Sequence, residues 1–152
     1  MADQREDEVR KGAHCAWQIH YHIVFPVKYR KALLDEVVTV IIQETAAEIA
    51  ARFPIEMEAI GTDKNHIHLL CSAHPQMAPG RIVQIFKRIT AREIFRRKPA
   101  VKRVLWGGEL WTDGYLCGDG GGASELADRR TVRAAARAAP RRSPAAPNVL
   151  VL

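Results

Sequence analysis

Residues 17–25 read WQIHYHIVF. Apolar residues occupy every second position of this stretch, and a period of two is typical of a strand that has one face against a core. The strand is predicted to end at Pro26. The residues of its apolar face are Trp17, Ile19, Tyr21, Ile23 and Phe25.

The periodicity of the following segments predicts the other elements. Apolar residues at helical spacing indicate a long amphipathic helix over residues 34–53. Residues 55–59 alternate again as a second strand, and residues 66–73 (HIHLLCSA) read as a third strand that forms a hairpin with it. A second helix covers residues 81–98, and residues 104–115 (VLWGGELWTDGY) indicate a fourth strand or a hairpin.

This order of strand, helix, strand, strand, helix, strand predicts the fold class. It is the split βαβ arrangement of a ferredoxin-like, or RRM-like, α+β sandwich with two helices on one face of an antiparallel sheet. Residues 1–13 are polar and are predicted to be a frayed N-terminus. Residues 14–116 form the domain. Residues 117–152 are rich in Ala, Arg, Gly and Pro, and are predicted to be a low-complexity, disordered tail.

Composition limits the class of protein. A chain of 152 residues corresponds to about one domain, and no apolar run is long enough to span a membrane. The charged start (MADQREDEVRKG) does not resemble a signal peptide, so we expect a cytoplasmic protein. Its three cysteines lie far apart and are expected to be reduced thiols. A net charge of +6 weakly favours a polyanionic partner.

Two His-x-His pairs are the candidate ligand residues. Residues two apart on a strand point to the same side, so His20 with His22, or His66 with His68, could hold one divalent ion or one phosphate. Either pair could instead be polar residues on a solvated or helix-facing side of a strand. The second pair is the stronger candidate because it follows a turn in mid-sheet, whereas His20 and His22 are expected to be structural or DNA-facing.

Four blocks resemble one enzyme family in order and spacing. These blocks are YHIVFPVKYRKALL, DKNHIHLL, PGRIVQIFKRITAREIF and LWGGELWTDGY. Within residues 14–116 they resemble the HUH single-tyrosine transposases of the smallest bacterial insertion sequences, which move as single-stranded DNA. The resemblance implies that His66 and His68 hold Mg²⁺ or Mn²⁺, that the partner is a single-stranded DNA hairpin end of a mobile element, and that the chain forms a homodimer.

The nucleophile of that family is missing from this sequence. The resemblance implies a tyrosine on a later helix that forms a 5′-phosphotyrosine link, with a glutamine four residues further on that completes the metal site. The tyrosines here are Tyr21, Tyr29 and Tyr115, and Tyr115 lies in the Asp-Gly-Tyr block upstream of the expected nucleophile. Tyr115 is therefore a poor substitute, and we expect the chain to be deficient in cleavage.

A shifted reading frame would explain the loss. If residues 116–137 are back-translated with permitted codons and read one base later, the string can contain a tyrosine followed four residues later by a glutamine. The tyrosine codon straddles Val132 and Arg133, and the glutamine codon straddles Ala136 and Arg137. The alternative is a divergent basic tail.

Basic residues on two segments are the predicted DNA contacts. They follow the first strand and line the second helix, where basic residues greatly outnumber acids; the alternative is an ordinary solvated face. The predicted contacts are Lys28, Arg30, Lys31, Arg81, Lys87, Arg88 and Arg92. Trp106 and Trp111 could stack on unpaired bases or pack in the core.

Two other functions remain open from the residues. One is a non-catalytic RNA- or DNA-binding module of RRM-like fold, although such modules carry stacking aromatic residues where this chain has His66 and His68. The other is a small metal-dependent hydrolase that uses these histidines with Asp63 or Glu58.

Overall fold

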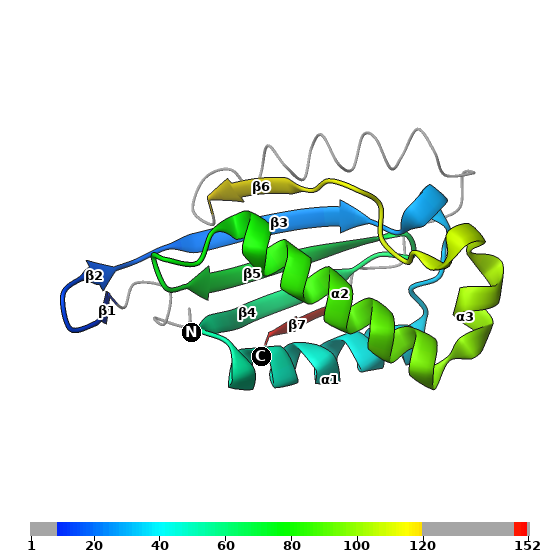
Figure 1. Ribbon diagram of the computed structural model, residues 1–152, viewed down its shortest axis with the longest axis horizontal. Coiled ribbons are helices and arrows are strands. Elements are labelled where there is room, and N and C mark those ends of the chain that lie inside the picture. Colours follow the sequence, from blue (N-terminus) through cyan, green and yellow to red (C-terminus); the bar gives the residue numbers. More distant parts are fainter. Residues whose placement is uncertain (1–8, 120–147, 152) are drawn as a thin grey trace.

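The computed structural model describes residues 9–119 and 148–151, and its centre is one antiparallel sheet (Figure 1). The strand order is β6-β3-β5-β4-β7, so β3 and β5 have a neighbour on both sides. The strands are β3 His20–Pro26, β4 Ile55–Thr62, β5 His66–Ala73, β6 Leu116–Asp119 and β7 Asn148–Val151. A separate two-stranded hairpin pairs β1 Arg10–Lys11 with β2 Ala16–Trp17.

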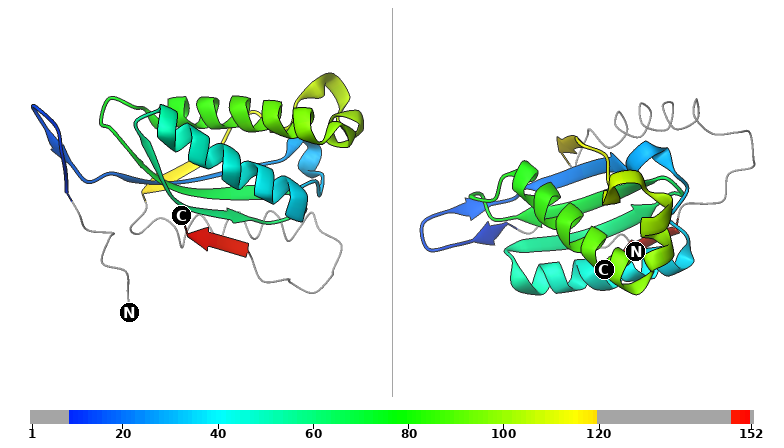
Figure 2. Two further views of the ribbon diagram at one scale, coloured as in Figure 1. Left: turned by 90° about the horizontal axis from the view of Figure 1, so that it is seen from below. Right: turned by 45° about the vertical axis from the view of Figure 1, so that its right-hand side comes forward.

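Two long helices cover one face of this sheet. Helix α1 spans Glu36–Arg52 and α2 spans Pro79–Arg97, and the edge-on view places both on the same side of the strands (Figure 2). Asp35 caps α1 by accepting a hydrogen bond from Val38 N at 2.9 Å. Pro79 opens α2 at a position where a missing N–H costs nothing. The predicted ferredoxin-like sandwich is confirmed.

The core lies between the helices and the sheet. Odd-numbered residues of β3 and β5, such as Ile23, Phe25, Ile67 and Leu69, are buried against the apolar faces of α1 and α2. Two ion pairs at the protein surface link the end of α2 to α1: Arg97 with Glu44, and Lys98 with Asp35. The alternation in residues 17–25 and 66–73 thus distributes side chains between the face that α1 and α2 cover and the far face, which no helix of residues 9–119 covers.

The fourth strand differs from its predicted position. Within residues 104–115 the chain forms the end of α3 (Pro99–Val104), the 3₁₀ turn η3 (Trp106–Gly108) and an isolated bridge between Val27 and Trp111. Three glycines with φ values of 71°, 72° and 87° turn the chain repeatedly here, which prevents a continuous strand. The strand β6 begins only at Leu116 and pairs with β3. The first strand also begins later than predicted, at His20.

Both ends of the described chain contain strands where the sequence predicted none. Arg10–Lys11 lies in the segment expected to be frayed, and β7 and all of β6 except Leu116 lie within the tail expected to be disordered. β6 pairs with the outer edge of β3, and β7 pairs with the outer edge of β4. The N–H and C=O groups at such an edge can form hydrogen bonds with any segment, whether its side chains are polar or apolar. Residues 1–8 and 120–147, with Leu152, lie outside the described part. No helix within it is long and apolar enough to cross a membrane.

Candidate functional site

The histidines of the two His-x-His pairs lie on the far face of the sheet, away from α1 and α2. The register pairs Pro26 with His66 and Val24 with His68. Opposite residues in an antiparallel pair share a face, and so do residues two apart along one strand. The four histidines of the two His-x-His pairs therefore lie on the side of the sheet away from α1 and α2.

Three of these histidines form a cluster. His66 is only 5% exposed, and its ring centroid lies 4.9 Å from that of His68 in an edge-on arrangement. The His68 ring stacks on His22 with a centroid distance of 5.4 Å and an interplanar angle of 18°. The distance from His68 Nδ1 to His22 Nε2 is 3.3 Å, and His66 Nδ1 lies 2.8 Å from Asn65 Oδ1. From the sequence, His22 was expected to be a structural or DNA-facing residue, separate from His66 and His68.

The chemistry of the His66 and His68 rings fits a divalent cation. Asn65 Oδ1 can only accept, so His66 Nδ1 carries the proton and a neutral His66 ring has its lone pair at Nε2. Neutral imidazole nitrogen is a common metal ligand. Within residues 9–119 and 148–151, no group of three or more His, Cys, Asp or Glu side chains is arranged to hold an ion. The two imidazoles are thus a partial ligand set.

The carboxylates considered as further ligands are engaged elsewhere. Glu58 Oε1 lies 2.7 Å from His20 Nδ1, in a pair that connects β3 to β4 across the intervening strand β5. Asp63 Oδ1 accepts a hydrogen bond from Lys64 N at 2.7 Å within the turn before β5. The structure therefore separates the first His-x-His pair: His20 contacts a carboxylate and His22 contacts His68.

Two of the tyrosines lie on the other side of the sheet from His66 and His68. Tyr21 packs against the core, and burial raises the pKa of its phenol above the ordinary value. Tyr115 is 44% exposed, and its hydroxyl oxygen lies against Gly80 in the first turn of α2, where an added Cβ would approach it to 3.1 Å. Tyr29 is 60% exposed in the turn after β3.

That turn carries the first group of predicted DNA contacts. Tyr29 and Arg30 have φ values of 60° and 51°, a left-handed conformation that costs a non-glycine residue about 1–2 kcal/mol. Lys28 Nζ donates to Glu109 Oε2 at 2.8 Å, which raises the Lys28 pKa, and Lys31 Nζ donates to Val104 O at 2.7 Å. The turn follows Pro26, whose partner in the register is His66. Its three basic residues therefore lie near the end of β3 that pairs with His66.

The second group lies on α2, on the opposite side of the sheet from the histidines. Arg81, Arg88 and Arg92 are exposed, and their spacing of seven and four residues aligns them in one stripe along the helix. Beside Arg81 and Arg88 is a pocket of about 40 Å³, which is too small for a nucleotide base. This stripe therefore offers charge to phosphates, and it does not face His66 and His68.

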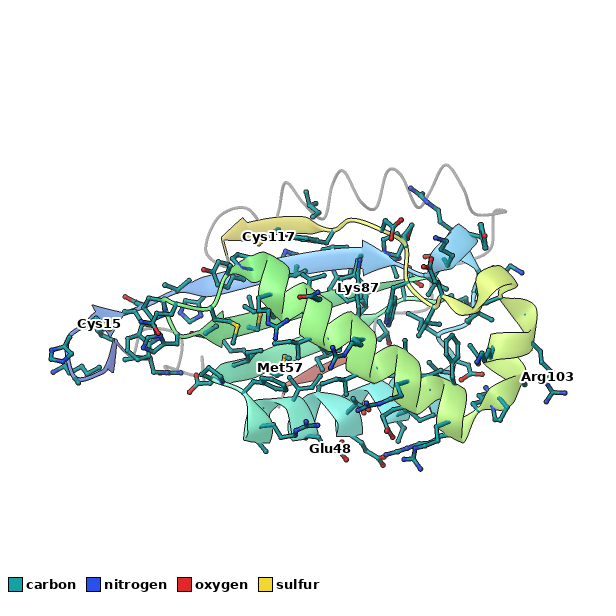
Figure 3. The ribbon with its side chains drawn as sticks, viewed as in Figure 1. Cys15, Glu48, Met57, Lys87, Arg103 and Cys117 are labelled. Atoms are coloured by element: carbon teal, nitrogen blue, oxygen red, sulfur yellow. The ribbon has the colours of Figure 1, made fainter. Side chains whose placement is uncertain are left out.

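Lys87 has a different environment from those arginines. It is half-buried on the side of α2 that faces β3 (Figure 3). Its Nζ donates to Thr112 O and Gly114 O, both at 2.7 Å, and lies 5.1 Å from the centroid of the Phe25 ring. Burial lowers its pKa below the ordinary lysine value, and Asp113 opposes this shift. Lys87 holds the segment that leads to β6, a role that the sequence did not reveal.

Trp111 also belongs to the core. It is 5% exposed, its ring meets Phe25 edge-on at 4.9 Å, and its Nε1 donates to Thr90 Oγ1 at 3.0 Å. These contacts favour packing in the core over base stacking, the two roles that the sequence left open for Trp111. The side chain of Trp106 lies outside the described part of the structure.

Comparisons with known proteins agree with the resemblance inferred from the four sequence blocks. Residues 15–131 match the family model described as "Transposase IS200 like". The chain belongs to this family of DNA transposases, and its assignment to the single-tyrosine class is confirmed. It is 36% identical over 108 residues to ISDra2 transposase TnpA of Deinococcus radiodurans, an alignment that covers 71% of this chain and 77% of that protein.

Solved structures give the same result for the fold. A candidate transposase from Deinococcus radiodurans R1, known from its crystal structure, superposes with a TM-score of 0.74 at 26% identity. The alignment covers 82% of this chain and 96% of that one. A REP-associated tyrosine transposase bound to a REP hairpin aligns with a TM-score of 0.48 at 13% identity, over 87% of this chain and 68% of that one. That likeness is too distant to bear on the ligand of this chain.

Proposed function

We propose that this chain binds single-stranded or hairpin DNA at the ends of a mobile element, and that His66 and His68 hold Mg²⁺ or Mn²⁺ against the bound strand. The observation that supports this most strongly is the placement of both imidazoles on the far face of a central strand, away from α1 and α2, in a member of a transposase family. When bound, such an ion neutralises phosphate charge and orients the scissile phosphodiester.

The residues around the histidines prepare the site for such a strand. Asn65 fixes the orientation and tautomer of His66 through its side-chain oxygen. The turn with Lys28, Arg30 and Lys31 places positive charge at the same end of β3, where a phosphate backbone would gain Coulomb energy. Arg81, Arg88 and Arg92 extend the basic surface to the other side of the sheet. We propose that DNA contacts both regions and that the chain acts as a homodimer.

We further propose that the chain in this form is a DNA binder that does not cleave. Of its three tyrosines, Tyr21 and Tyr115 lie on the helix-covered side of the sheet. The alternative of an RNA-binding module of RRM-like fold is less well supported, because such modules place stacking aromatic residues on the exposed face of the central strands. Here the corresponding face of the sheet, away from α1 and α2, carries His22, His66 and His68.

Calorimetric titration with Mn²⁺ tests the metal site. We expect the wild-type chain to bind Mn²⁺ weakly, because two imidazoles are a partial ligand set, and the His66→Ala, His68→Ala double variant to show no binding heat. His74→Ala is the matched control, since His74 lies beyond the end of β5 and its ring packs against Trp17. An unchanged isotherm in the double variant would show that the ion binds elsewhere.

The salt dependence of DNA binding tests the arginine stripe. If the chain neutralises about four to six phosphates of a single strand, the slope of log K against log salt is about −3 to −4. Replacing Arg81, Arg88 and Arg92 by Gln removes three contacts and is expected to flatten that slope by about 2. A control variant loses the same charge away from α2 and is expected to keep the wild-type slope. Its substitutions are Lys11→Gln, Lys102→Gln and Arg103→Gln. Equal slopes in the two triple variants would place the DNA site away from α2.

A further inference from the structure

The side chain of Tyr29 is held away from the core. It is 60% exposed, in the 3₁₀ turn η2 (Lys28–Arg30) that follows β3. Tyr21, by contrast, packs against the core from the preceding strand. An aromatic ring stabilises a fold by burying its apolar faces, and the Tyr29 ring leaves most of its surface in water. Packing therefore gives no reason for an aromatic residue at this position.

The backbone of the turn is fixed on either side of the ring. Val27 N donates to Asn65 O at 2.8 Å, and Lys28 N donates to Leu110 O at 2.7 Å. These bonds join the turn to the loop before β5 and to the segment before β6. Tyr29 has a φ of 60° and a ψ of 16°, a left-handed conformation that asparagine or glycine adopts more readily than tyrosine does. Strain that the surrounding bonds maintain in this way is typical of ligand-binding segments.

Positive charge lies beside the ring. Lys28 Nζ is 5.9 Å from the centroid of the Tyr29 ring, although Glu109 pairs with it at 2.8 Å. The Lys31 ammonium donates to the neutral carbonyl of Val104, so that contact leaves its charge in place. A base stacked on Tyr29 would have its phosphate near these ammonium groups. Aromatic rings beside basic groups are the combination with which proteins bind unpaired nucleic acid strands.

The ring also lies within reach of a strand bound at His66. Pro26 is opposite His66 in the register, so their Cα atoms are about 5 Å apart. The chain from Pro26 to Tyr29 spans at most about 11 Å. The Cα atoms of His66 and Tyr29 are therefore at most about 16 Å apart, which is the length of about five stacked nucleotides.

We propose that Tyr29 is a base-stacking residue: its exposed ring stacks on one unpaired nucleobase of the bound DNA strand, with the phosphate of that nucleotide beside the basic turn. The inference rests on the proposed function, since it assumes that the chain binds single-stranded DNA. Every base has a π-face, so this contact adds affinity with little preference for sequence. It favours an unpaired strand over a duplex, in which neighbouring base pairs cover the faces of each base.

Binding of a short unpaired oligonucleotide that contains one 2-aminopurine tests the contact. Stacking on an aromatic ring quenches the fluorescence of this base analogue. In Tyr29→Ala we expect less quenching and an affinity lower by about 5- to 150-fold, the effect of one lost stacking contact. The slope of log K against log salt is expected to stay the same, because no charge is removed. Tyr29→Phe keeps the ring and is expected to keep both the quenching and the affinity.

Two further variants separate binding from folding. Asparagine tolerates the left-handed backbone better than tyrosine does, so Tyr29→Asn is expected to raise Tm by about 2–4 °C while it lowers DNA affinity as Tyr29→Ala does. A residue with a merely structural role would lose affinity and stability together. Val37→Ala is the matched control, since it truncates a side chain of similar exposure on α1, and it is expected to leave affinity and quenching unchanged.

Three results would overturn the inference. These are an unchanged affinity for the single strand in Tyr29→Ala and Tyr29→Asn, a loss in Tyr29→Ala that is equally large for a duplex of the same sequence, and a Tyr29→Phe variant as weak as Tyr29→Ala. A wild-type chain that binds no single-stranded DNA would refute the proposed function and this inference with it. Binding that survives Tyr29→Ala at full strength refutes this inference alone.

Discussion

Incubated with Mg²⁺ and a single-stranded hairpin end, this chain is expected to form no covalent protein–DNA adduct. In the single-tyrosine transposases that its sequence resembles, cleavage joins a tyrosine oxygen to the 5′-phosphate of the broken strand. In a serine protease, which also forms a covalent intermediate, removing the nucleophile costs on the order of 10⁶ in rate. The expected yield of adduct on a denaturing gel is therefore below detection.

The positions of the tyrosines explain this expectation. The Tyr21 side chain packs on the helix-covered face of β3, and the Tyr115 hydroxyl contacts the first turn of α2. The sheet itself separates both from a phosphate bound at His66 and His68. Tyr29 is exposed in the single 3₁₀ turn Lys28–Arg30, where its own backbone is left-handed, and not on an α-helix such as the one on which the resemblance places the nucleophile.

The repaired reading frame provides the positive arm of the experiment. In that version the sequence from residue 116 is read one base later with the permitted codons that give a tyrosine and, four residues on, a glutamine, which would share one helical face. We expect this version to form the adduct and to lose it when that tyrosine is replaced by phenylalanine. An adduct from the original chain that survives Tyr115→Phe would show that it cleaves by another residue. No adduct from the repaired version would refute the reading-frame interpretation.

Periodicity along the chain predicted the elements whose large apolar residues gather on one side. The alternation in residues 17–25 and 66–73 and the helical spacing in α1 and α2 reflect the apolar core between helices and sheet, so these elements were predictable without the structure. The same alternation placed His66 and His68 on one face. The segment 104–115 was misread because its tryptophans suggested a strand, whereas its glycines turn the chain.

Contacts that depend on strand register could not be predicted. The approach of His22 to His68 arises because β3 and β5 pair with Val24 opposite His68; a register shifted by two residues would give His68 another diagonal neighbour. The pairing of His20 with Glu58 further requires that β5 separates β3 from β4. Lys87 looked like its neighbouring arginines in sequence, and only the path of residues 112–114 reveals its carbonyl partners.

Trp111→Ala is expected to destabilise the fold strongly while leaving the DNA-binding surfaces in place. The indole is 5% exposed, packs edge-on against Phe25 at 4.9 Å, and donates from Nε1 to Thr90 Oγ1 at 3.0 Å. Truncating a buried tryptophan costs about 3–5 kcal/mol, because both the transfer free energy and the packing around the cavity are lost. In a chain of this size that loss lowers Tm by about 10–20 °C.

Two milder variants separate the contribution of the Trp111 ring packing from that of its hydrogen bond to Thr90. Trp111→Phe keeps most of the ring contact with Phe25 and loses the N–H donor, so a cost of about 1–2 kcal/mol is expected. Thr90→Val removes the acceptor instead and leaves the indole N–H buried without its partner, at about 1–3 kcal/mol. Thermal and urea unfolding measure these costs, and hairpin DNA titrations run below each Tm measure the affinity. If Trp111 served base stacking instead, Trp111→Ala would lower DNA affinity with little change in Tm, because an exposed indole contributes little to the core.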